Sequence, residues 1–465
     1  MMNSSEDRFE PSSSMLALAA DKMAGDVSLA DRIQSNEVNV VALNQFESLS
    51  WKCLGAGLVG NVLEWYDFGL YGFLAPLIGA HFFPSTNPLA SLLGAYGGFA
   101  IGFAMRPVGA AVFGHIGDRI GRRTVLLLSV VMMGLATTVI GVLPTYRQIG
   151  VWAPVFLVAI RLFQGLSVGG QYTGSVSYLV ETAPSHRRGF AGSFANIGSA
   201  GGYILAAALA AVTLIQLHHH SEFPWIWRLP FLTGGVIASI AFLLRRYLTR
   251  TGYQPDRSHR NHEELPLKLA FRESPRSMIL AMVFTWGYGV LSYLTLVFLP
   301  VFASRFGKIN IGEALTINAV LQMVAVAFVP LAGWLTDRFI RRRTLMLLVF
   351  AVVSLSTIKF FNLASDGDLW KFCVAQGCLI VLLFLVEGTE PAMMAELFAS
   401  RYRMSGYSVA LNVGLGIGGG TAPLIATALI GPLGRLAGAG YLVVCAVMTL
   451  GALFLMPDHS RQPLT

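Results

Sequence analysis

The chain has 465 residues, of which 54% are hydrophobic and only 12% are charged, whereas an average soluble domain is roughly 25% charged. This composition excludes an ordinary soluble enzyme or binding domain and predicts a protein with many membrane-spanning segments. The net charge of +8 reflects the loops between these segments and does not predict nucleic-acid binding. The four cysteines show neither metal-ligand spacing nor a disulfide framework.

Residues 1–52 form a polar, acid-rich stretch ahead of the first apolar segment. They lack the basic start and apolar core of a secretory signal, so we predict a mobile cytoplasmic tail without an assigned function. Residues 14–34 could form a short amphipathic helix. The alternative is an over-long choice of start, with Met15 and Met23 as later candidates.

Twelve apolar segments follow, each close to or above the roughly 20 residues that a helix needs to cross a bilayer. The segments are residues 54–82, 89–116, 124–143, 152–182, 190–217, 228–248, 278–302, 312–339, 344–362, 369–397, 406–432 and 438–456. We therefore predict an all-α membrane protein with twelve transmembrane helices. Its parts are an N-terminal six-helix bundle (53–248), a cytoplasmic linker (249–277), a C-terminal six-helix bundle (278–456) and a short C-terminal tail (457–465).

Lys and Arg lie mostly on one side of the predicted membrane. If both termini are cytoplasmic, that side holds 24 of the 33 basic residues, the opposite loops hold six, and Arg106, Arg161 and Arg228 lie within spans. Positively charged loops stay in the cytoplasm during insertion. We therefore predict a multi-pass protein of the cytoplasmic (inner) membrane with both termini inside.

An internal repeat relates the two halves of the chain. A shift of 219 residues superposes GHIGDRIGRRT, which starts at Gly114, on GWLTDRFIRRRT, which starts at Gly333. A second echo relates Glu181 and Arg188 to Glu396 and Arg403, at the ends of the fourth and tenth spans. Two homologous six-helix halves are typical of secondary transporters, which bind substrate between the halves near mid-membrane.

The loop that follows the second span, G-x-x-x-D-R-x-G-R-R, resembles the signature loop of the major facilitator superfamily. The likeness is greatest to its metabolite:proton symporter family, through WYDF, RPVG, RLFQGLSVGGQYTG, ETAPSHRRGF and WRLPF, which start at Trp65, Arg106, Arg161, Glu181 and Trp227. This resemblance implies a proton-coupled transporter of metabolites with two pseudo-symmetric six-helix bundles. Two positions depart from the pattern: Gln171 stands where the family often has Glu, and Ile340 replaces the second signature glycine.

The repeated loops predict a gate on the cytoplasmic side. A carboxylate there can accept hydrogen bonds from the amino terminus of a neighbouring helix, and loop arginines can pair with Glu181 and Glu396 in contacts that must separate when this side opens. The alternative is that the arginines only set the topology. The predicted gate residues are Gly114, Asp118, Arg119, Arg122, Glu181, Asp337, Arg338, Arg341 and Glu396.

Acidic residues within the spans predict proton coupling. A carboxylate in a span costs about 2.5–3.5 kcal/mol unless it faces protein or water. Glu64 and Asp67 share one face of the first span, at a depth where Arg106 can meet them. We predict that Asp67, Glu64 and Glu387 couple protons to transport. For Glu64 and Asp67 the alternative is a permanent ion pair with Arg106, and for Glu390 a solvated vestibule and a role in proton release are equally open.

Arg161 is predicted to contact the substrate, because a guanidinium stays charged and matches the planar geometry of a carboxylate. The alternative is an arginine that packs helices together and pairs with an acid. The predicted substrate-binding residues are Arg161, Arg106, Gln164, Gln171, Tyr66 and Tyr172. Arg228 is expected to anchor the membrane boundary.

We predict a non-enzymatic, monomeric symporter that takes up a small carboxylate-bearing metabolite, driven by the proton gradient without cofactor or metal. The resemblance implies organic acids or, alternatively, zwitterionic osmolytes such as proline and betaine, and the short C-terminal tail favours organic acids. The same scaffold also allows a proton-antiport exporter of amphipathic compounds, and a receptor without transport is a third possibility. The His218–His220 run and GLGIGGG (Gly414–Gly420) are interpreted as a polar turn and a helix-packing segment, because neither has the partners of a metal or phosphate site.

Overall fold

The computed structural model describes residues 51–110, 112, 122–167, 171–219, 225–248, 266–460, 462 and 464. Within these ranges every regular element is a helix. Most of the predicted tail and the first part of the predicted linker lie outside the described residues. Side chains of residues 51–60, 122–126, 171, 218–219, 241, 244–248 and 266–267 are likewise outside the description.

The first half contains six spans. Its helices are α2 (Trp51–Phe73), α3 (Ala75–Phe82), α4 (Pro88–Ala104), α6 (Arg122–Val142), α7 (Tyr146–Ile149), α8 (Trp152–Ser167), α9 (Gln171–Thr182), α10 (Arg188–His219) and α11 (Leu229–Leu248), with short 3₁₀ turns η1 (Ser185–Arg187) and η2 (Ile226–Arg228). The span that begins with α4 continues to Ala110, and α8 and α9 belong to one span, Trp152–Thr182.

The second half contains the other six. Its helices are α12 (Pro266–Glu273), α13 (Pro275–Tyr293), α14 (Leu299–Gly307), α15 (Ile311–Ala325), α16 (Phe328–Arg338), α17 (Arg342–Ala364), α18 (Leu369–Glu396), α19 (Arg403–Leu411), α20 (Gly420–Leu433) and α21 (Ala437–Leu455), with π-helical segments η4 (Leu294–Phe298) and η5 (Asn412–Gly419) inside the seventh and eleventh spans.

Nine helical stretches of the described chain are long and apolar enough to cross a membrane. Two further spans have shorter apolar parts, Leu127–Val142 and Ile226–Ile240, and the remaining one is α2, which contains Glu64 and Asp67. Most boundaries of the twelve spans lie within a few residues of those predicted from the sequence. The protein is therefore an all-α membrane protein of twelve helices in two pseudo-symmetric bundles.

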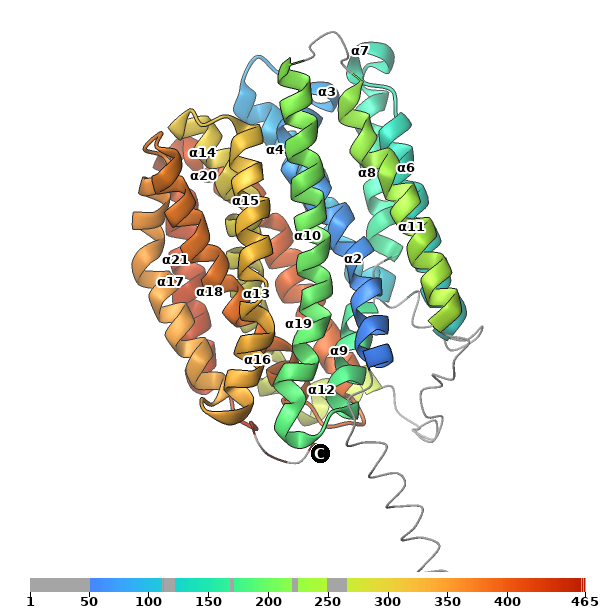
Figure 1. The fold of residues 1–465 in the computed structure, drawn as a ribbon, viewed down its shortest axis with the longest axis vertical. Coiled ribbons are helices and arrows are strands. Elements are labelled where there is room, and N and C mark those ends of the chain that lie inside the picture. The colour runs from blue at the N-terminus through green and yellow to red at the C-terminus, as the bar shows by residue number, and fades with distance from the viewer. Residues whose placement is uncertain are drawn as a thin grey trace, which may run out of the picture. The chain divides into compact units, whose positions relative to one another are not determined.

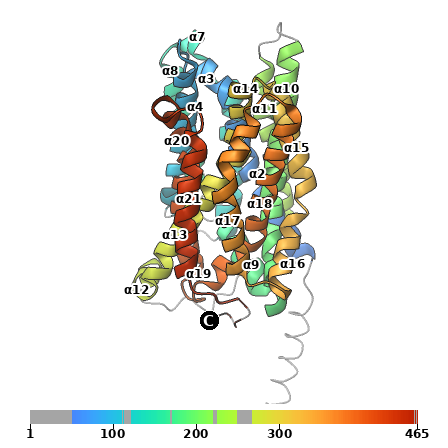
Figure 2. The same cartoon turned by 90° about the vertical axis from the view of Figure 1, so that its left-hand side faces the viewer.

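The two halves contact each other through several pairs of helices, which include α10 with α18 and α9 with α18 and α19. Helix α10 lies between α2 of its own half and α15 and α16 of the second half (Figure 1). On another side of the bundle, α4 lies against α20 (Figure 2). Side chains that project from α2, α4, α9, α10, α13, α18 and α19 can therefore meet between the halves.

Glycine allows backbones to approach each other closely where α4 and α8 cross. A Cβ atom on Gly165 would lie 2.1 Å from the carbonyl oxygen of Gly102, and one on Gly109 would lie 2.2 Å from that of Leu166. Small residues at such crossings let membrane helices gain van der Waals contact that lipid cannot supply. This crossing holds the fourth span, which includes Arg161 and Gln164, against the second.

We predict that Gly165→Ala destabilises the protein by about 1–3 kcal/mol, because the added methyl group forces two backbones apart. The matched control is Gly97→Ala, where a Cβ atom would meet nothing within 4 Å. Thermal unfolding of the purified proteins measures both changes. Equal melting temperatures for the two variants would contradict the crossing geometry.

A buried charged site between the two halves

Glu64 of α2 and Arg106 of the second span form a buried ion pair. Three rings surround the guanidinium, whose Cζ atom lies 5.2 Å from the ring centre of Phe68, 5.2 Å from Phe103 and 5.7 Å from Trp65. Arg106 also borders the second half, because its Cδ atom would lie 3.9 Å from a Cβ atom on Gly416. The pair therefore lies at the boundary between the halves.

Asp67 pairs with a different arginine. Its Oδ2 accepts a hydrogen bond from Arg161 Nη1 at 3.2 Å, and its Oδ1 accepts bonds from Thr137 at 2.5 Å and from Gln164 Nε2 at 2.8 Å. Arg161 Nη1 also donates to Gln164 Oε1 at 2.8 Å, and its Cζ lies 4.2 Å from the ring centre of Tyr71. All these partners belong to the first half.

This pairing corrects the expectation that Glu64 and Asp67 share Arg106. Both guanidinium groups lie against the Phe68 ring, with the Cζ atoms of Arg106 and Arg161 each 5.2 Å from its centre. Each acid therefore has its own arginine. Arg161, expected to contact substrate, has no exposed surface and pairs with an acid of its own half, which is the helix-packing role that its sequence position also allows.

Glu390 of α18 connects the halves without an arginine. Its Oε1 accepts a hydrogen bond from Tyr407 of α19 at 2.8 Å, and its Oε2 lies 3.1 Å from the hydroxyl of Tyr172 of α9. The Tyr172 hydroxyl is also 2.9 Å from Oδ1 of Asn196 of α10. Glu390 is fully buried, so these neutral groups are its environment rather than the solvated vestibule considered from the sequence.

Glu387 lies one turn away on α18 and is also buried. Its Oε2 atom has no hydrogen-bond partner, while its backbone carbonyl accepts a bond from Asn196 Nδ2 at 2.7 Å. No Lys or Arg of the described chain forms an ion pair with Glu387 or Glu390. The two arginines are already balanced by Glu64 and Asp67, so these two carboxylates are a surplus of acid over base.

Aromatic rings from both halves form a continuous cluster beside these charges. The ring of Trp65 is 6.2 Å from Tyr172 and 5.6 Å from Tyr203, measured between centroids. Tyr172 lies 6.5 Å from Tyr407, across the boundary between the halves. Phe103 and Tyr293 make a second contact across that boundary at 5.2 Å. Such rings can hold an organic cation against their faces.

Two other residues were predicted to bind substrate, Tyr66 and Gln171. The Tyr66 hydroxyl donates to the Pro230 carbonyl at 2.6 Å and lies 3.0 Å from Thr233 Oγ1, so Tyr66 packs α2 against α11 and does not face the other half. These contacts favour a packing role for Tyr66 over the predicted substrate-binding role, because it is next in sequence to Trp65 and so points in another direction around the helix. The side chain of Gln171 lies outside the described residues.

The predicted gate is built around Asp337 at the end of α16. Its carboxylate accepts hydrogen bonds from the backbone N–H groups of Gly189 at 2.8 Å and Phe190 at 2.9 Å, at the amino terminus of α10. Arg342 donates to Asp337 at 3.1 Å and to both carboxylate oxygens of Glu396 at 2.8 Å. Asp337 thereby joins the second half to a helix amino terminus of the first, where negative charge is favoured.

A second contact across the halves is the ion pair between Arg403 and Glu181, at 2.8 Å. Of the arginines predicted for the gate, Arg338 and Arg341 are exposed, and Arg338 lies over the Trp334 ring at 6.0 Å. Arg342 and Arg403, which were not assigned to the gate, form ion pairs with its acids. Arg341 caps α17 rather than lying in it, so the side chain that reaches back to Asp337 is that of the next residue. Gly114, Asp118 and Arg119 lie outside the described residues, as does the Arg122 side chain.

The gate contacts and the burial of the central charges define a closed conformation.

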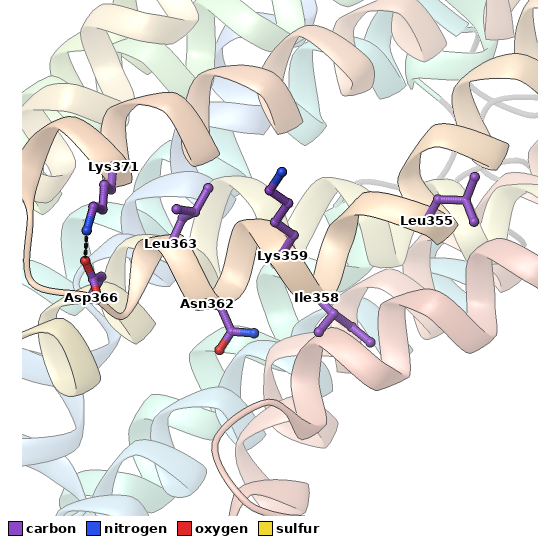
Figure 3. A pocket seen from close by; sticks show the side chains of 7 residues that line it. All are labelled: Leu355, Ile358, Lys359, Asn362, Leu363, Asp366 and Lys371. Atoms are coloured by element: carbon purple, nitrogen blue, oxygen red, sulfur yellow. Dashed lines mark hydrogen bonds and ion pairs between the residues drawn. The ribbon is translucent and has the colours of Figure 1, made fainter.

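Two clefts lie on the periphery of the bundle, away from the central charges. One of about 540 Å³ is at the ends of α17 and α18 (Figure 3), and one of about 400 Å³ is lined by apolar side chains of α6 and α8. Within the described chain, no group of three or more His, Cys, Asp or Glu side chains could hold a metal ion.

An all-helical membrane bundle of two repeated halves, with buried charges where the halves meet, is the architecture of a secondary transporter. The model of the Major Facilitator Superfamily matches residues 57–388, and the chain belongs to this family. It is a multi-pass membrane transporter and not an enzyme.

The chain is 30% identical over 425 residues to the proline/betaine transporter of Salmonella typhimurium and to that of Escherichia coli (strain K12), with 89% of this chain and 84% of each relative covered. Among solved structures it is similar to the proton:xylose symporter XylE, with a TM-score of 0.68 at 15% identity over 89% of this chain and 97% of that chain. A bacterial homologue of the human lysosomal transporter Spinster has a TM-score of 0.60 at 16% identity, covering 86% and 95% of the two chains.

Several residues of the site were not predicted from the sequence. Trp65, Asn196, Tyr203 and Tyr407 have no charge to distinguish them from other polar or aromatic residues of the spans. Arg403 was identified only as part of the repeat with Arg188. The signal that could have found Tyr407 is its position four residues after Arg403, because residues at this spacing share one face of α19.

We predict that Glu181→Gln loosens the closed gate. The ion pair is partly exposed, with the Glu181 side chain 45% exposed, so its loss is worth up to about 1 kcal/mol, or about a two- to fivefold change in the open population. A cysteine introduced at buried Ser193, in a variant without native cysteines, should react correspondingly faster with a maleimide. The matched control is Glu273→Gln, which breaks an ion pair with Arg401 inside the second half. Equal labelling rates in the two variants would show that the Glu181 contact does not hold the gate.

We also predict that Tyr66→Phe lowers the free energy of unfolding by about 1 kcal/mol, because a buried hydrogen bond to the Pro230 carbonyl is lost. Substrate affinity should stay unchanged, because the hydroxyl contacts only α11. Thermal unfolding and substrate titration of the same sample measure the two effects. A loss of affinity at unchanged stability would restore Tyr66 to the substrate site.

Proposed function

We propose that the protein takes up a small zwitterionic solute, of the betaine or proline type, together with protons across the cytoplasmic membrane. Such a solute is a carboxylate-bearing metabolite that also carries a cationic nitrogen. The observation that carries the proposal is the surplus of two buried carboxylates, Glu387 and Glu390, beside aromatic rings and near the Glu64–Arg106 pair.

The charge balance favours a cationic group in the ligand. An uncompensated charge in a dry interior costs several kcal/mol, so two acids without a base require positive charge from elsewhere. A proton can supply it, and so can the ammonium group of a substrate. A di- or tricarboxylate would instead add negative charge to a site that already has an excess of it.

The aromatic cluster supports the same class of ligand. The faces of Trp, Tyr and Phe rings attract quaternary ammonium groups by about 0.5–2 kcal/mol each. Trp65, Tyr172 and Tyr407 lie along one side of the cluster, between the Arg106 guanidinium and Glu390. A zwitterion could therefore place its carboxylate toward Arg106 and its ammonium toward the acids of α18. The names of the relatives, proline/betaine transporters, agree with this class.

Of the three residues predicted to couple protons, Glu387 fits the role best. Glu64 and Asp67 each have an arginine, whereas Glu387 has an oxygen without a partner. In this proposal a proton and the substrate ammonium together balance Glu387 and Glu390. The proton and the substrate are both released inside before the empty carrier returns. A proton that stayed on these acids would be carried back out, so coupled uptake requires its release, and this links the two fluxes.

Uptake into proteoliposomes tests the proposal. Labelled glycine betaine and proline should accumulate when an inward proton gradient is imposed, and a protonophore should abolish accumulation. Succinate, citrate and 2-oxoglutarate serve as the organic-acid arm. If only these acids accumulate under the gradient, the second candidate function, proton-coupled uptake of organic acids, replaces the first. Arg106 would then be the group that recognises the substrate carboxylate. Betaine efflux driven by the gradient from preloaded vesicles would indicate an exporter instead.

Two isosteric substitutions separate coupling from structure. Glu387→Gln should leave the melting temperature unchanged or raised, because no partner loses its charge, but should abolish gradient-driven accumulation. Glu64→Gln should lower the free energy of unfolding by about 3–5 kcal/mol, because it leaves Arg106 buried without a counter-charge. Thermal unfolding and uptake are measured on both. Full gradient-driven uptake by Glu387→Gln would remove this residue from the coupling mechanism.

A further inference from the structure

A cleft of about 540 Å³ lies on the lipid-facing side of the second half, between the end of α17 and the start of α18 (Figure 3). One part of its lining is polar, with Lys359, Asn362, Asp366 and Lys371. The other part is apolar and continues along α17 to Leu355, which is 86% exposed. The cleft therefore complements an amphipathic ligand, which has a polar part and an apolar part.

The polar part contains one cation too many. The ammonium of Lys371 forms an ion pair with Asp366, as the dashed line in Figure 3 shows. Lys359 is exposed and forms no ion pair with any acid of the described chain. At the rim, Arg435 donates to Asn362 Oδ1 at 3.4 Å, and the carboxylate of Asp368, which caps α18, offsets this further positive charge. The charge of Lys359 remains as the surplus. The surplus positive charge of the cleft favours binding of an anion.

The depth of Lys359 in the membrane indicates that the anion comes from a lipid headgroup and not from bulk water. Helix α17 ends at Ala364, so Lys359 lies about 7.5 Å inside the end of the span at 1.5 Å per residue. Trp370, at the start of α18 and 73% exposed, is the kind of residue that marks the headgroup level. A lysine below this level, on a surface that faces lipid, is within reach of lipid phosphates and out of reach of bulk water except by extending its chain.

We propose that this cleft binds a phospholipid with a net negative headgroup, in the leaflet opposite the Asp337 gate. The phosphate lies on Lys359, and an acyl chain follows Leu355 and Ile358 along α17. A zwitterionic headgroup brings its own ammonium, which competes with Lys359 for the phosphate and leaves the surplus positive charge of the cleft unbalanced. Anionic lipid is therefore preferred.

Native mass spectrometry of the detergent-purified protein tests this proposal. The protein is titrated with phosphatidylglycerol or with phosphatidylcholine of the same acyl chains. The wild type should retain one phosphatidylglycerol at least about tenfold better than phosphatidylcholine, a difference equivalent to about 1.4 kcal/mol. Lys359→Gln should lose this preference, and Lys359→Arg should keep it. Inorganic phosphate, as a competitor, distinguishes a lipid site from a simple anion site.

The matched control is Arg147→Gln, which removes one exposed positive charge from α7 in the first half, away from the cleft. It should keep the preference for phosphatidylglycerol. Equal retention of the two lipids by the wild type, or an equal loss in Arg147→Gln and Lys359→Gln, would overturn the proposal. Displacement of the lipid by millimolar phosphate would assign the cleft to a free anion instead.

Discussion

The constraint on which the rest of this structure depends is the balance of charge inside a membrane. Four acids and two arginines are buried at the centre of the bundle, and water is not available there to solvate them. Two of the acids are neutralised by the ion pairs of Glu64 with Arg106 and of Asp67 with Arg161. Glu387 and Glu390 have no such partner in the described chain, and a proton or a cationic group of a ligand would balance them.

The positions of the charges give them different functions. Asp67 and Arg161 are surrounded by side chains of the first half, with Thr137 and Gln164 completing their hydrogen bonds, so they stabilise that half as a rigid unit. Arg106, Glu387 and Glu390 lie where the halves meet. The contacts of Asp337 with the amino terminus of α10 and of Arg403 with Glu181 join the two halves in this conformation.

Much of the fold could be predicted from the sequence. Apolar segments and the polar residues between them locate the twelve spans, because a bilayer requires about 20 residues of every crossing helix. The repeat of the Asp-Arg loop places Asp337 at a helix end, which is where it meets the amino terminus of α10. The pairing of an acid of the first span with Arg106 could be predicted from their similar depth along straight helices, and Glu64 does pair with Arg106.

The partners of these charges could not be predicted, because they depend on the rotation of each helix about its axis. A depth argument could not tell that Glu64 pairs with Arg106 and Asp67 with Arg161, or that Tyr66 points to α11 while Trp65 lies against Tyr172 and Tyr203. The repeat also could not tell which arginine of the second loop reaches the acids. Arg341 is the residue that caps α17, so Arg342, one residue further along, pairs with Asp337 and Glu396.

The central claim is that the surplus carboxylates select a ligand with a cationic group. Glycine betaine and 3,3-dimethylbutanoate have the same shape and the same carboxylate, and differ in a quaternary nitrogen that is replaced by carbon. Calorimetric titration of the purified protein with both ligands isolates the contribution of that one charge. Betaine should bind at least about tenfold more tightly, and equal or tighter binding of the anionic isostere, which lacks the cationic nitrogen, would contradict the account.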